Sequence, residues 1–335
     1  MKIFVYSIRD DEKPYFDTFA QKYGCTYEST KEYPSPENAH YVKGFDVVNI
    51  ITTRTDCQMI DLFYHYGVRC IATRTIGYDH IDLEYAASLG IGVTNVSYSP
   101  NSVANFTIML MLMGCRKMQQ IMQRTAVQDF SLSGKMGIEL SNCTVGVIGT
   151  GRIGEQVIRH LSGFGCRLLA YDLFPKDSLR EIATYTPLDE LISSSDIITL
   201  HCPGIPENYH LINRQRIRRM KNGVMLINAA RGSLIDSEAL IEGLENGKIR
   251  FAGLDTVENE TGLYYLNKTG EVIKNHQLAV LRSYPNVLFS PHMAFYTDEA
   301  VSNMVEYSIL AATQFLTTGK SAYLVNKIAY TKTAF

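Results

Sequence analysis

Three apolar, strand-like runs in the second half of the chain are each followed directly by ionisable side chains. These are residues 224–228 before Arg231, residues 251–254 before the acidic loop of Asp255, Glu258 and Glu260, and residues 286–290 before His292. Because the carboxyl ends of parallel strands meet along one edge of a sheet, we expect the arginine, a carboxylate and the histidine to lie together there.

Such a set is suited to the reduction of a 2-oxo acid by a nicotinamide cofactor. Hydride addition creates negative charge on the carbonyl oxygen, and a nearby acid must supply a proton. A histidine that a carboxylate keeps protonated can supply that proton. An arginine can bind the substrate carboxylate through two hydrogen bonds and polarise the carbonyl.

A dinucleotide-binding motif precedes these strands and follows the apolar run of residues 145–148. It consists of Gly149, Thr150, Gly151, Arg152, Ile153 and Gly154, and an amphipathic helical pattern continues from it. The first glycine permits a tight turn, the second lets the backbone approach a diphosphate, and the third lets the helix pack on the strand. The diphosphate is expected at the free N–H groups of that helix.

An acidic residue closes the next strand-like run. Asp172 stands 18 residues beyond Gly154, where a carboxylate accepts hydrogen bonds from the ribose diol of adenosine. Its charge would repel a 2′-phosphate, residues 173–175 contain no arginine, and Lys176 is expected to be solvated. We therefore expect NAD rather than NADP.

Each candidate residue also has an ordinary structural explanation. Arg231 before a glycine is typical of an ion-pair partner, and acidic loops are usually only solvated. His292 could cap a helix or bond a core carbonyl, and His201, at another strand end, competes with it. The combination of the three groups behind a dinucleotide motif favours catalysis over these explanations.

Composition excludes several other classes of protein. The 335 residues suggest two domains, and 32 basic against 34 acidic residues provide no basic surface for nucleic acid or a membrane. The seven cysteines are scattered without a C-x-x-C pair, which indicates neither a disulfide framework nor a metal site and is typical of the cytoplasm. The first seven residues are too short for a signal peptide, and the apolar run 108–113 is too short to span a membrane.

The order of apolar runs predicts two α/β series. Strands and helices alternate through residue 97, and a second series begins at residue 144. Between them, Ser99 and Pro100 begin a helix that is apolar on every side, which we expect to be buried by its own domain and by a partner subunit. A last helix is predicted from about Thr297, its N-cap, to residue 316, and residues 329–335 receive no assignment.

Taken together, these residues resemble the D-2-hydroxyacid dehydrogenase family over nearly the whole chain. The matching segments are residues 76–82, 95–100, 147–154, 199–203, 227–232, 253–255 and 291–297. The sequence His292-Met-Ala-Phe-Tyr-Thr is similar to the D-lactate dehydrogenase branch, which includes the 2-hydroxyisocaproate dehydrogenases. Glycerate, phosphoglycerate and formate dehydrogenases usually differ at or near this histidine or at its carboxylate partner.

The resemblance implies two Rossmann-like or flavodoxin-like parallel-sheet domains, with an NAD domain (101–296) inserted into a substrate domain (1–100 and 297–335). It implies that Arg231 binds substrate, that His292 is the acid/base and that Glu260 is its partner. The remaining implied contacts are Ile76, Gly77, Tyr98 and Phe295 for the substrate, and Gly149, Gly151, Arg152, Ile153, Gly154, Asp172, Cys202, Pro203, Ala229 and Asp255 for NAD.

The expected activity is NAD-dependent reduction of a small 2-oxo acid, with pyruvate to D-lactate as the first choice. Two alternatives stay open. One is a 2-hydroxyisocaproate-type dehydrogenase for larger branched or aromatic 2-oxo acids, and the other is an NAD-sensing regulatory protein such as the corepressors that resemble this family. The resemblance also implies a homodimer formed through the NAD domain. Departures from the family pattern are Met293 and the pair Gly204-Ile205 in the adenine loop.

Overall fold

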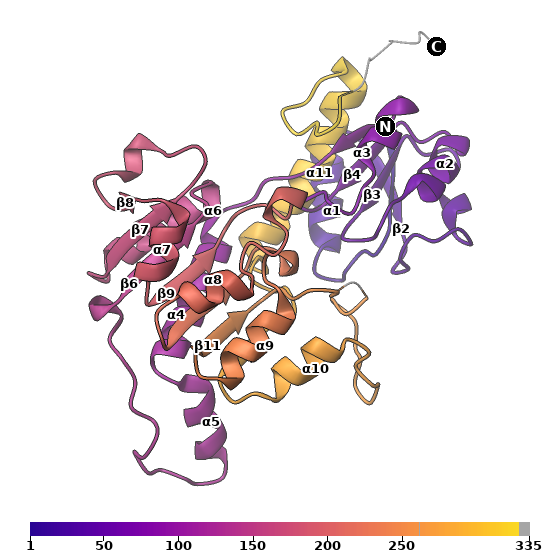
Figure 1. Cartoon of the computed structure of the whole chain (residues 1–335). Helices are drawn as coiled ribbons and strands as arrows, with labels where there is room; N and C mark the ends of the chain where they lie inside the picture. Colours follow the sequence, from indigo (N-terminus) through magenta and orange to yellow (C-terminus); the bar gives the residue numbers. More distant parts are fainter. Residues whose placement is uncertain (261, 328–335) are drawn as a thin grey trace. The chain divides into compact units, whose positions relative to one another are not determined.

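The computed structural model describes residues 1–260 and 262–327 and divides into two compact units. Unit 1 comprises Met1–Ser99 and Tyr296–Phe335, and unit 2 comprises Pro100–Phe295. The unassigned tail of residues 329–335 lies outside the described residues. Each unit is built on one parallel sheet with helices on both faces (Figure 1), which confirms the predicted class of two α/β domains, one inserted into the other.

Unit 1 has a five-stranded sheet in the order β2-β1-β3-β4-β5, which is the flavodoxin-like order. Its strands are β1 (Lys2–Val5), β2 (Thr26–Ser29), β3 (Val47–Ile50), β4 (Cys70–Thr73) and β5 (Gly92–Thr94). Its helices are α1 (Lys13–Lys22), α2 (Cys57–His65), α3 (Leu83–Ser88) and α11 (Asp298–Thr318).

Two apolar clusters hold unit 1 together, one on each face of the sheet. Helices α1 and α11 cover one face, where Phe16 and Phe315 pack on the strands. Helices α2 and α3 cover the other, where Phe63 is fully buried. The predicted N-cap of α11 is confirmed, because the Thr297 side chain accepts a hydrogen bond from the Ala300 N–H.

Unit 2 has a seven-stranded sheet in the order β12-β11-β10-β9-β6-β7-β8, in which every pair is parallel. This is the Rossmann order extended by a seventh strand. Its strands are β6 (Thr144–Ile148), β7 (Arg167–Tyr171), β8 (Thr184–Tyr185), β9 (Ile197–Leu200), β10 (Val224–Asn228), β11 (Ile249–Leu254) and β12 (Val287–Phe289). Its helices are α4 (Asn101–Cys115), α5 (Met118–Ala126), α6 (Arg152–Ser162), α7 (Leu188–Ser194), α8 (Arg214–Arg219), α9 (Ser237–Glu245) and α10 (His276–Ser283).

The helices of unit 2 cover opposite faces of its sheet. Helices α4 and α6 share one apolar cluster with the strands, while α7, α8, α9 and α10 share the other. The predicted amphipathic pattern of α6 is confirmed, since Val157, Ile158 and Leu161 are buried and Ile153 packs against their cluster.

Helix α4 is not covered on every side by its own unit, and the expected cover by a partner subunit stays a prediction. Its side chains at Ile108, Met109, Leu112 and neighbouring positions border a shallow apolar depression of about 510 Å³. Helix α5 and the loop after it extend away from the sheet of unit 2 (Figure 1), and no side chain of α5 is buried. In the described part of the chain, no helix combines the length and apolarity needed to cross a membrane.

Four elements were absent from the sequence prediction. Strand β2 is an exposed edge strand of polar residues, and β8 has only two residues, so neither carries an apolar run. Helix α5 lacks a buried face, and α10 lies in a stretch to which no helix or strand was assigned. None of the four carries a candidate site residue.

Candidate active site

The glycines of the dinucleotide motif lie where a side chain could not be accommodated or would obstruct a ligand. Gly149, which directly follows β6, has φ +94°, and a Cβ there would lie 2.7 Å from the backbone of His201 and Cys202. A Cβ on Gly154 would lie 1.9 Å from the Gly149 carbonyl oxygen, whereas one on Gly151 would meet nothing within 4 Å. The turn is therefore closed toward the sheet and open at Gly151, as a dinucleotide cradle requires.

Helix α6 begins at Arg152, directly after Gly151, so its first N–H groups and its positive end lie at this opening. Asp172 follows β7, and its carboxylate accepts hydrogen bonds from the Thr150 N–H at 2.5 Å and the Phe174 N–H at 2.8 Å. The expected ribose acceptor thus lies beside the glycine turn. Lys176 is not merely solvated, because its Nζ lies 2.7 Å from the Glu155 carboxylate.

The adjacent strands β10, β11 and β12 bring the three predicted catalytic groups to one edge of the sheet. Arg231 follows β10, Glu260 lies in the loop after β11, and His292 follows β12. Strand β11 pairs with both of its neighbours in parallel. The carboxyl ends of the three strands therefore lie next to one another, as the sequence predicted.

His292 is held in a left-handed backbone conformation, with φ +54°. Its N–H donates to the Asp255 carbonyl oxygen at 2.8 Å, and the buried Asp255 carboxylate accepts from Ser290 Oγ, Met293 N and Ala294 N at 2.6–2.9 Å. Asp255 therefore fixes the loop that carries the histidine, and its implied contact with nicotinamide stays a prediction. A non-glycine residue with positive φ is typical of sites where the surrounding structure stabilises local strain.

Glu260 faces the imidazole of His292. The distance from Glu260 Oε1 to His292 Nδ1 is 3.6 Å, and Glu260 Oε2 accepts the Val257 N–H at 2.8 Å. Burial raises the pKa of the Glu260 carboxyl, and the neighbouring His292 opposes this effect. The pair has the composition of an acid/base histidine with its carboxylate, in which Nε2 is left to exchange a proton with a ligand.

Arg231 belongs to the same cluster, since its positive charge also acts on the Glu260 carboxyl and lowers its pKa, though less than His292 does. Close backbone packing fixes its position. A Cβ on Gly232 would lie 2.0 Å from the Val257 carbonyl oxygen, and one on Gly204 would lie 2.8 Å from Arg231 Cγ. The family departure at Gly204 therefore leaves room for the Arg231 side chain.

The buried Asn228 at the end of β10 shapes the turn that leads to Arg231. Its amide donates to the Arg231 carbonyl oxygen at 2.8 Å and its Oδ1 accepts from Ala230 N at 3.1 Å, and the predicted cofactor contact Ala229 lies within this turn. Asn228 lies within the family-like segment 227–232, but no role was predicted for it. An amide at a buried strand end before a turn is the signal that could have indicated one.

The other carboxylate of the acidic loop is bound elsewhere. Glu258 Oε1 lies 2.7 Å from His210 Nε2, and Glu258 Oε2 accepts the Ser237 N–H at 2.8 Å. This pair joins the loop after β9 to the loop that carries Glu260, so Glu258 is a structural partner and not a solvated side chain. His210 was missed because no local pattern connects it with a residue 48 positions away.

The competing histidine is unsuited to proton transfer near neutral pH. Removal from water lowers the pKa of His201 to about 3, and its Nε2 lies 2.9 Å from Thr199 Oγ1. Burial likewise raises the pKa of the neighbouring Cys202 to about 11. The segment that follows β9, beside the glycine turn, is therefore uncharged near neutral pH. It consists of His201, Cys202 and Pro203.

Unit 1 contains the predicted substrate contacts Ile76, Gly77 and Tyr98. The Ile76 carbonyl oxygen accepts from Asn95 Nδ2 at 2.8 Å, and the Gly77 carbonyl oxygen accepts from Thr75 Oγ1 at 2.6 Å. Within residues 1–260 and 262–327, no protein acceptor lies against the N–H groups of Ile76 and Gly77. These two amides are thus available to an anion.

A buried ion pair holds Arg74, the residue directly before the loop that carries Ile76 and Gly77. Arg74 is fully buried, and its guanidinium lies 2.9 Å from Glu12 Oε1 and 2.6 Å from Asn49 Oδ1. It also donates to the carbonyl oxygens of Tyr6 and Ser7. Arg74 lies between the end of β4 and residues 75–77. The network therefore fixes the backbone at the start of the loop that carries the Ile76 and Gly77 amides.

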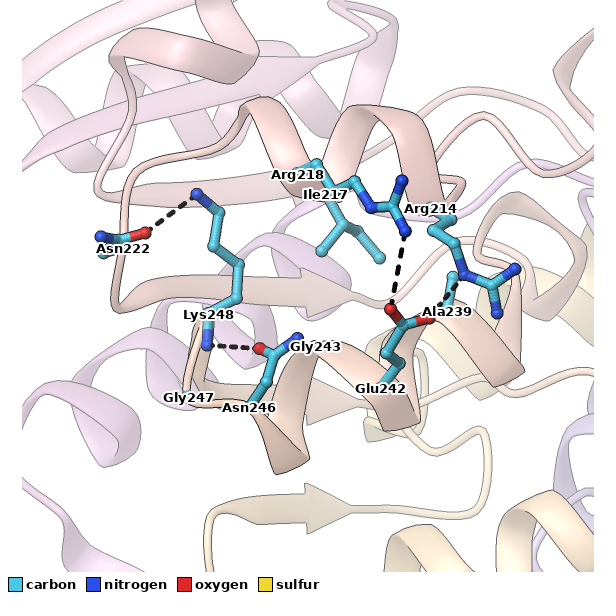
Figure 2. Close-up of a pocket in the computed structure, with 10 residues that line it drawn as sticks. All are labelled: Arg214, Ile217, Arg218, Asn222, Ala239, Glu242, Gly243, Asn246, Gly247 and Lys248. Carbon is cyan, nitrogen blue, oxygen red and sulfur yellow. Dashed lines mark hydrogen bonds and ion pairs between the residues drawn. The ribbon is translucent and has the colours of Figure 1, made fainter.

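A groove of about 410 Å³ in unit 2 is not part of this site (Figure 2). It lies between α8 and α9, and Asn222 and Lys248 place it near the amino ends of β10 and β11, opposite the catalytic edge. Figure 2 shows Arg214 and Arg218 directed at Glu242, and Lys248 directed at Asn222. Among the described residues, no group of three or more His, Cys, Asp or Glu side chains could hold a metal ion.

Comparison with known proteins gives a consistent result. Residues 108–294 match the family described as D-isomer specific 2-hydroxyacid dehydrogenase, NAD binding domain. An aromatic 2-oxoacid reductase of Clostridium sporogenes is 46% identical over 318 residues, which are 94% of this chain and 96% of that protein. A D-lactate dehydrogenase of Lactiplantibacillus plantarum is 37% identical over 325 residues, 96% of this chain and 98% of that protein. A solved structure of a D-2-hydroxyisocaproate dehydrogenase has a TM-score of 0.87 and 37% identity, and the match covers 98% of this chain and 100% of that one.

Replacing Asp172 with alanine is expected to weaken NADH binding about 10- to 100-fold, because hydrogen bonds to a charged acceptor are lost. The same change should strengthen NADPH binding, because the repulsion of a 2′-phosphate disappears. Both dissociation constants can be measured by titrating the enzyme with coenzyme. Asp177→Ala is the control, since that carboxylate is exposed and paired with Arg180. Unchanged affinities in Asp172→Ala would remove Asp172 from the coenzyme site.

Proposed function

The chain belongs to the family of D-isomer specific 2-hydroxyacid dehydrogenases, and on that premise we propose that it reduces 2-oxo acids with large or aromatic side chains to D-2-hydroxy acids. It is an NAD-dependent oxidoreductase. The observation that carries the proposed reduction of a 2-oxo acid is a cluster at three adjacent strand ends, beside a glycine turn shaped for a dinucleotide. The cluster consists of Arg231, Glu260 and His292.

In the proposed reaction, the bound dihydronicotinamide supplies the hydride that adds to the substrate carbonyl carbon. Arg231 binds the substrate carboxylate and draws electron density from the carbonyl. His292, protonated, gives its Nε2 proton to the oxygen on which negative charge develops, and becomes neutral. Glu260 stabilises the imidazolium before the transfer and orients the ring through Nδ1.

The coenzyme contacts proposed here are those of the glycine turn and its surroundings. Gly149, Gly151, Arg152, Ile153 and Gly154 would hold the diphosphate at the start of α6, and Asp172 would bind the adenosine ribose. Cys202, Pro203 and Ala229 would line the groove along the strand ends, and Asp255 would lie near the nicotinamide carboxamide.

We assign the substrate-domain role to unit 1 and the NAD-domain role to unit 2. Within unit 1, the amides of Ile76 and Gly77 would bind the substrate carboxylate, and Tyr98 would line the side-chain pocket. The family match to residues 108–294 supports the NAD assignment of unit 2. The buried Arg74 network supports the rigidity of the loop that carries the amide pair.

Two observations favour large side chains over pyruvate. The relative that is 46% identical is an aromatic 2-oxoacid reductase, whereas the D-lactate dehydrogenase above is 37% identical. The Tyr264 ring also packs on the His292 ring, and the neighbouring Tyr265 ring lies 6.2 Å from that of Phe295 between centroids. Rings of this kind favour a flat, aromatic substrate side chain. Reduction of pyruvate to D-lactate, our first expectation, is the alternative.

A substrate panel tests the proposal. With NADH, the enzyme should reduce phenylpyruvate and 2-oxoisocaproate with higher kcat/KM than pyruvate, and chiral analysis should identify D products. His292→Ala should lower kcat by a factor of about 10²–10⁴, the usual contribution of a positioned acid, with little change in NADH affinity. His276→Ala, on α10, is the matched control. A preference for pyruvate would support the lactate alternative, and coenzyme binding without any turnover would support the regulatory one.

Glu260→Gln should shift the pH dependence of reduction. Glutamine removes the negative charge 3.6 Å from His292 Nδ1, so the imidazolium is less stable and gives up its proton at lower pH. The alkaline fall of kcat/KM should therefore begin at lower pH than in the wild type. The exposed Glu271→Gln is the control. A pH profile that does not move would contradict the pairing of Glu260 with His292.

We also propose that the protein is a homodimer formed through unit 2. Large apolar side chains are exposed on α4, on α5 and in the loops that follow α5 and α6, namely Met109, Met122, Val127, Phe130, Leu132, Met136 and Phe164. Met109 and Phe164 border the same apolar depression, and exposed apolar patches mark interaction sites. Because the same surface would be present on both copies, a two-fold interface would cover both sets. The seven free cysteines suit a cytoplasmic location.

Light scattering after size exclusion should give twice the chain mass for the wild type. Phe130→Asp should shift the protein toward monomer, because a carboxylate would be buried in an apolar interface. Tyr64→Asp, which changes an exposed aromatic residue on α2 of unit 1, is the control. A wild-type protein that elutes as a monomer at micromolar concentration would contradict the proposed dimer.

A further inference from the structure

Tyr264 has a buried hydroxyl group with no hydrogen-bond partner. The side chain is only 9% exposed, and its oxygen has no acceptor or donor within reach among the described residues. Buried phenol groups usually find a partner, as Tyr6 does when it donates to the Asn38 carbonyl oxygen at 2.8 Å. Tyr264 is the only tyrosine with an unpartnered buried oxygen in residues 1–260 and 262–327.

The ring of Tyr264 packs against the proposed acid. Its centroid lies 4.9 Å from that of the His292 ring, with the two planes at 86°. His292 Nδ1 is itself a buried atom without a hydrogen bond, since Glu260 lies 3.6 Å from it. Two buried polar atoms without a hydrogen bond, the Tyr264 hydroxyl oxygen and His292 Nδ1, therefore belong to the two rings that pack on each other. This concentration distinguishes the contact from ordinary core packing, where polar groups are satisfied.

The backbone that presents Tyr264 is bent on both sides. Asn259 (φ +55°), Gly262 (φ +80°) and Tyr265 (φ +58°) all adopt left-handed conformations. The Leu263 N–H donates to the Glu260 carbonyl oxygen at 3.0 Å, which closes a tight turn directly after the catalytic carboxylate. These backbone conformations are energetically unfavourable, and with them Tyr264 packs on His292. Strained backbone of this kind is typical of functional sites.

From these observations we propose that the Tyr264 hydroxyl binds a polar group on the substrate side chain, so that the preferred 2-oxo acids carry a hydroxyl or similar hydrogen-bonding group there. This inference rests on the proposed function, in which the substrate carbonyl would lie against His292, the residue on which the Tyr264 ring packs. An unpaired buried hydroxyl is unfavourable in the free enzyme, and a matching substrate group removes that cost. A site of this kind discriminates strongly against analogues that lack the group.

Tyr264→Phe tests the proposal, because it deletes only the hydroxyl and keeps the ring against His292. Two matched pairs serve as substrates: (4-hydroxyphenyl)pyruvate with phenylpyruvate, and hydroxypyruvate with 2-oxobutyrate. In at least one pair, kcat/KM for the hydroxylated member should fall about 10-fold, as expected for the loss of one hydrogen bond. The apolar member should be unaffected or improved, and the dissociation constant of NADH should not change.

Tyr265→Phe is the matched control, because its hydroxyl donates to the His292 carbonyl oxygen at 3.4 Å. Any loss in that variant should be equal for both members of a pair. A second readout is the thermal midpoint of the free enzyme, which Tyr264→Phe should leave unchanged or raise, since an unpaired buried oxygen is removed.

Several outcomes would overturn the inference. Equal effects of Tyr264→Phe on both members of both pairs would show that the hydroxyl does not contact the substrate side chain. A clear fall in the thermal midpoint would show that a buried water or a protein group satisfies the hydroxyl. Absence of NADH-dependent reduction of all four acids by the wild type would instead contradict the proposed function, so the two failures are distinguishable.

Discussion

The buried carboxylate of Asp255 is the interaction on which the proposed catalytic centre depends. It lies at the end of β11, and three hydrogen bonds from the loop after β12 converge on it. A buried carboxylate without partners would be strongly destabilising, and bonds to a charged acceptor are among the stronger ones in proteins. The carboxylate and the loop therefore fix each other. His292, within that loop, takes its strained backbone conformation and its direction from this arrangement.

Groups of the same chemical type differ in this protein because their surroundings differ. His201 and His292 both follow strands of one sheet, yet desolvation lowers the pKa of His201 to about 3, while His292 has a carboxylate beside its ring. Glu258 and Glu260 are two residues apart, and one is bound by His210 and a helix amide while the other faces the imidazole. The site is thus defined by the pairing of residues more than by their types.

Much of this arrangement could be predicted from the sequence because its signals are local. The glycine motif, the acid after β7 and the ionisable residues after β10, β11 and β12 each depend on a few neighbouring positions, and the rule for parallel sheets brings the last three together. Apolar periodicity likewise identified the long buried strands and the core face of α6.

What the sequence could not provide depends on contacts between distant segments or on weak local signals. The separation of Glu258 from Glu260 requires His210, and the role of Asp255 requires the loop after β12, 35 to 39 residues further on. The edge strand β2 and the two-residue β8 have no apolar run to mark them. The sequence also could not show which side of α4 its own unit leaves uncovered, because an entirely apolar helix has no polar face to mark that side.

The split of unit 1 between the two ends of the chain has a consequence for biosynthesis. Helix α11 buries Val305, Ile309 and Phe315 on one face of the first sheet, and Asn326 bonds the backbone of Ile91 and Val93. These segments leave the ribosome after the whole of unit 2, so the strands of unit 1 are synthesised early and keep one apolar face uncovered until α11 follows. The inserted unit is continuous in sequence and is complete before them. A chain truncated before α11 therefore cannot complete unit 1, although the strands of that unit are translated first. A nascent chain needs protection from aggregation until α11 has been synthesised.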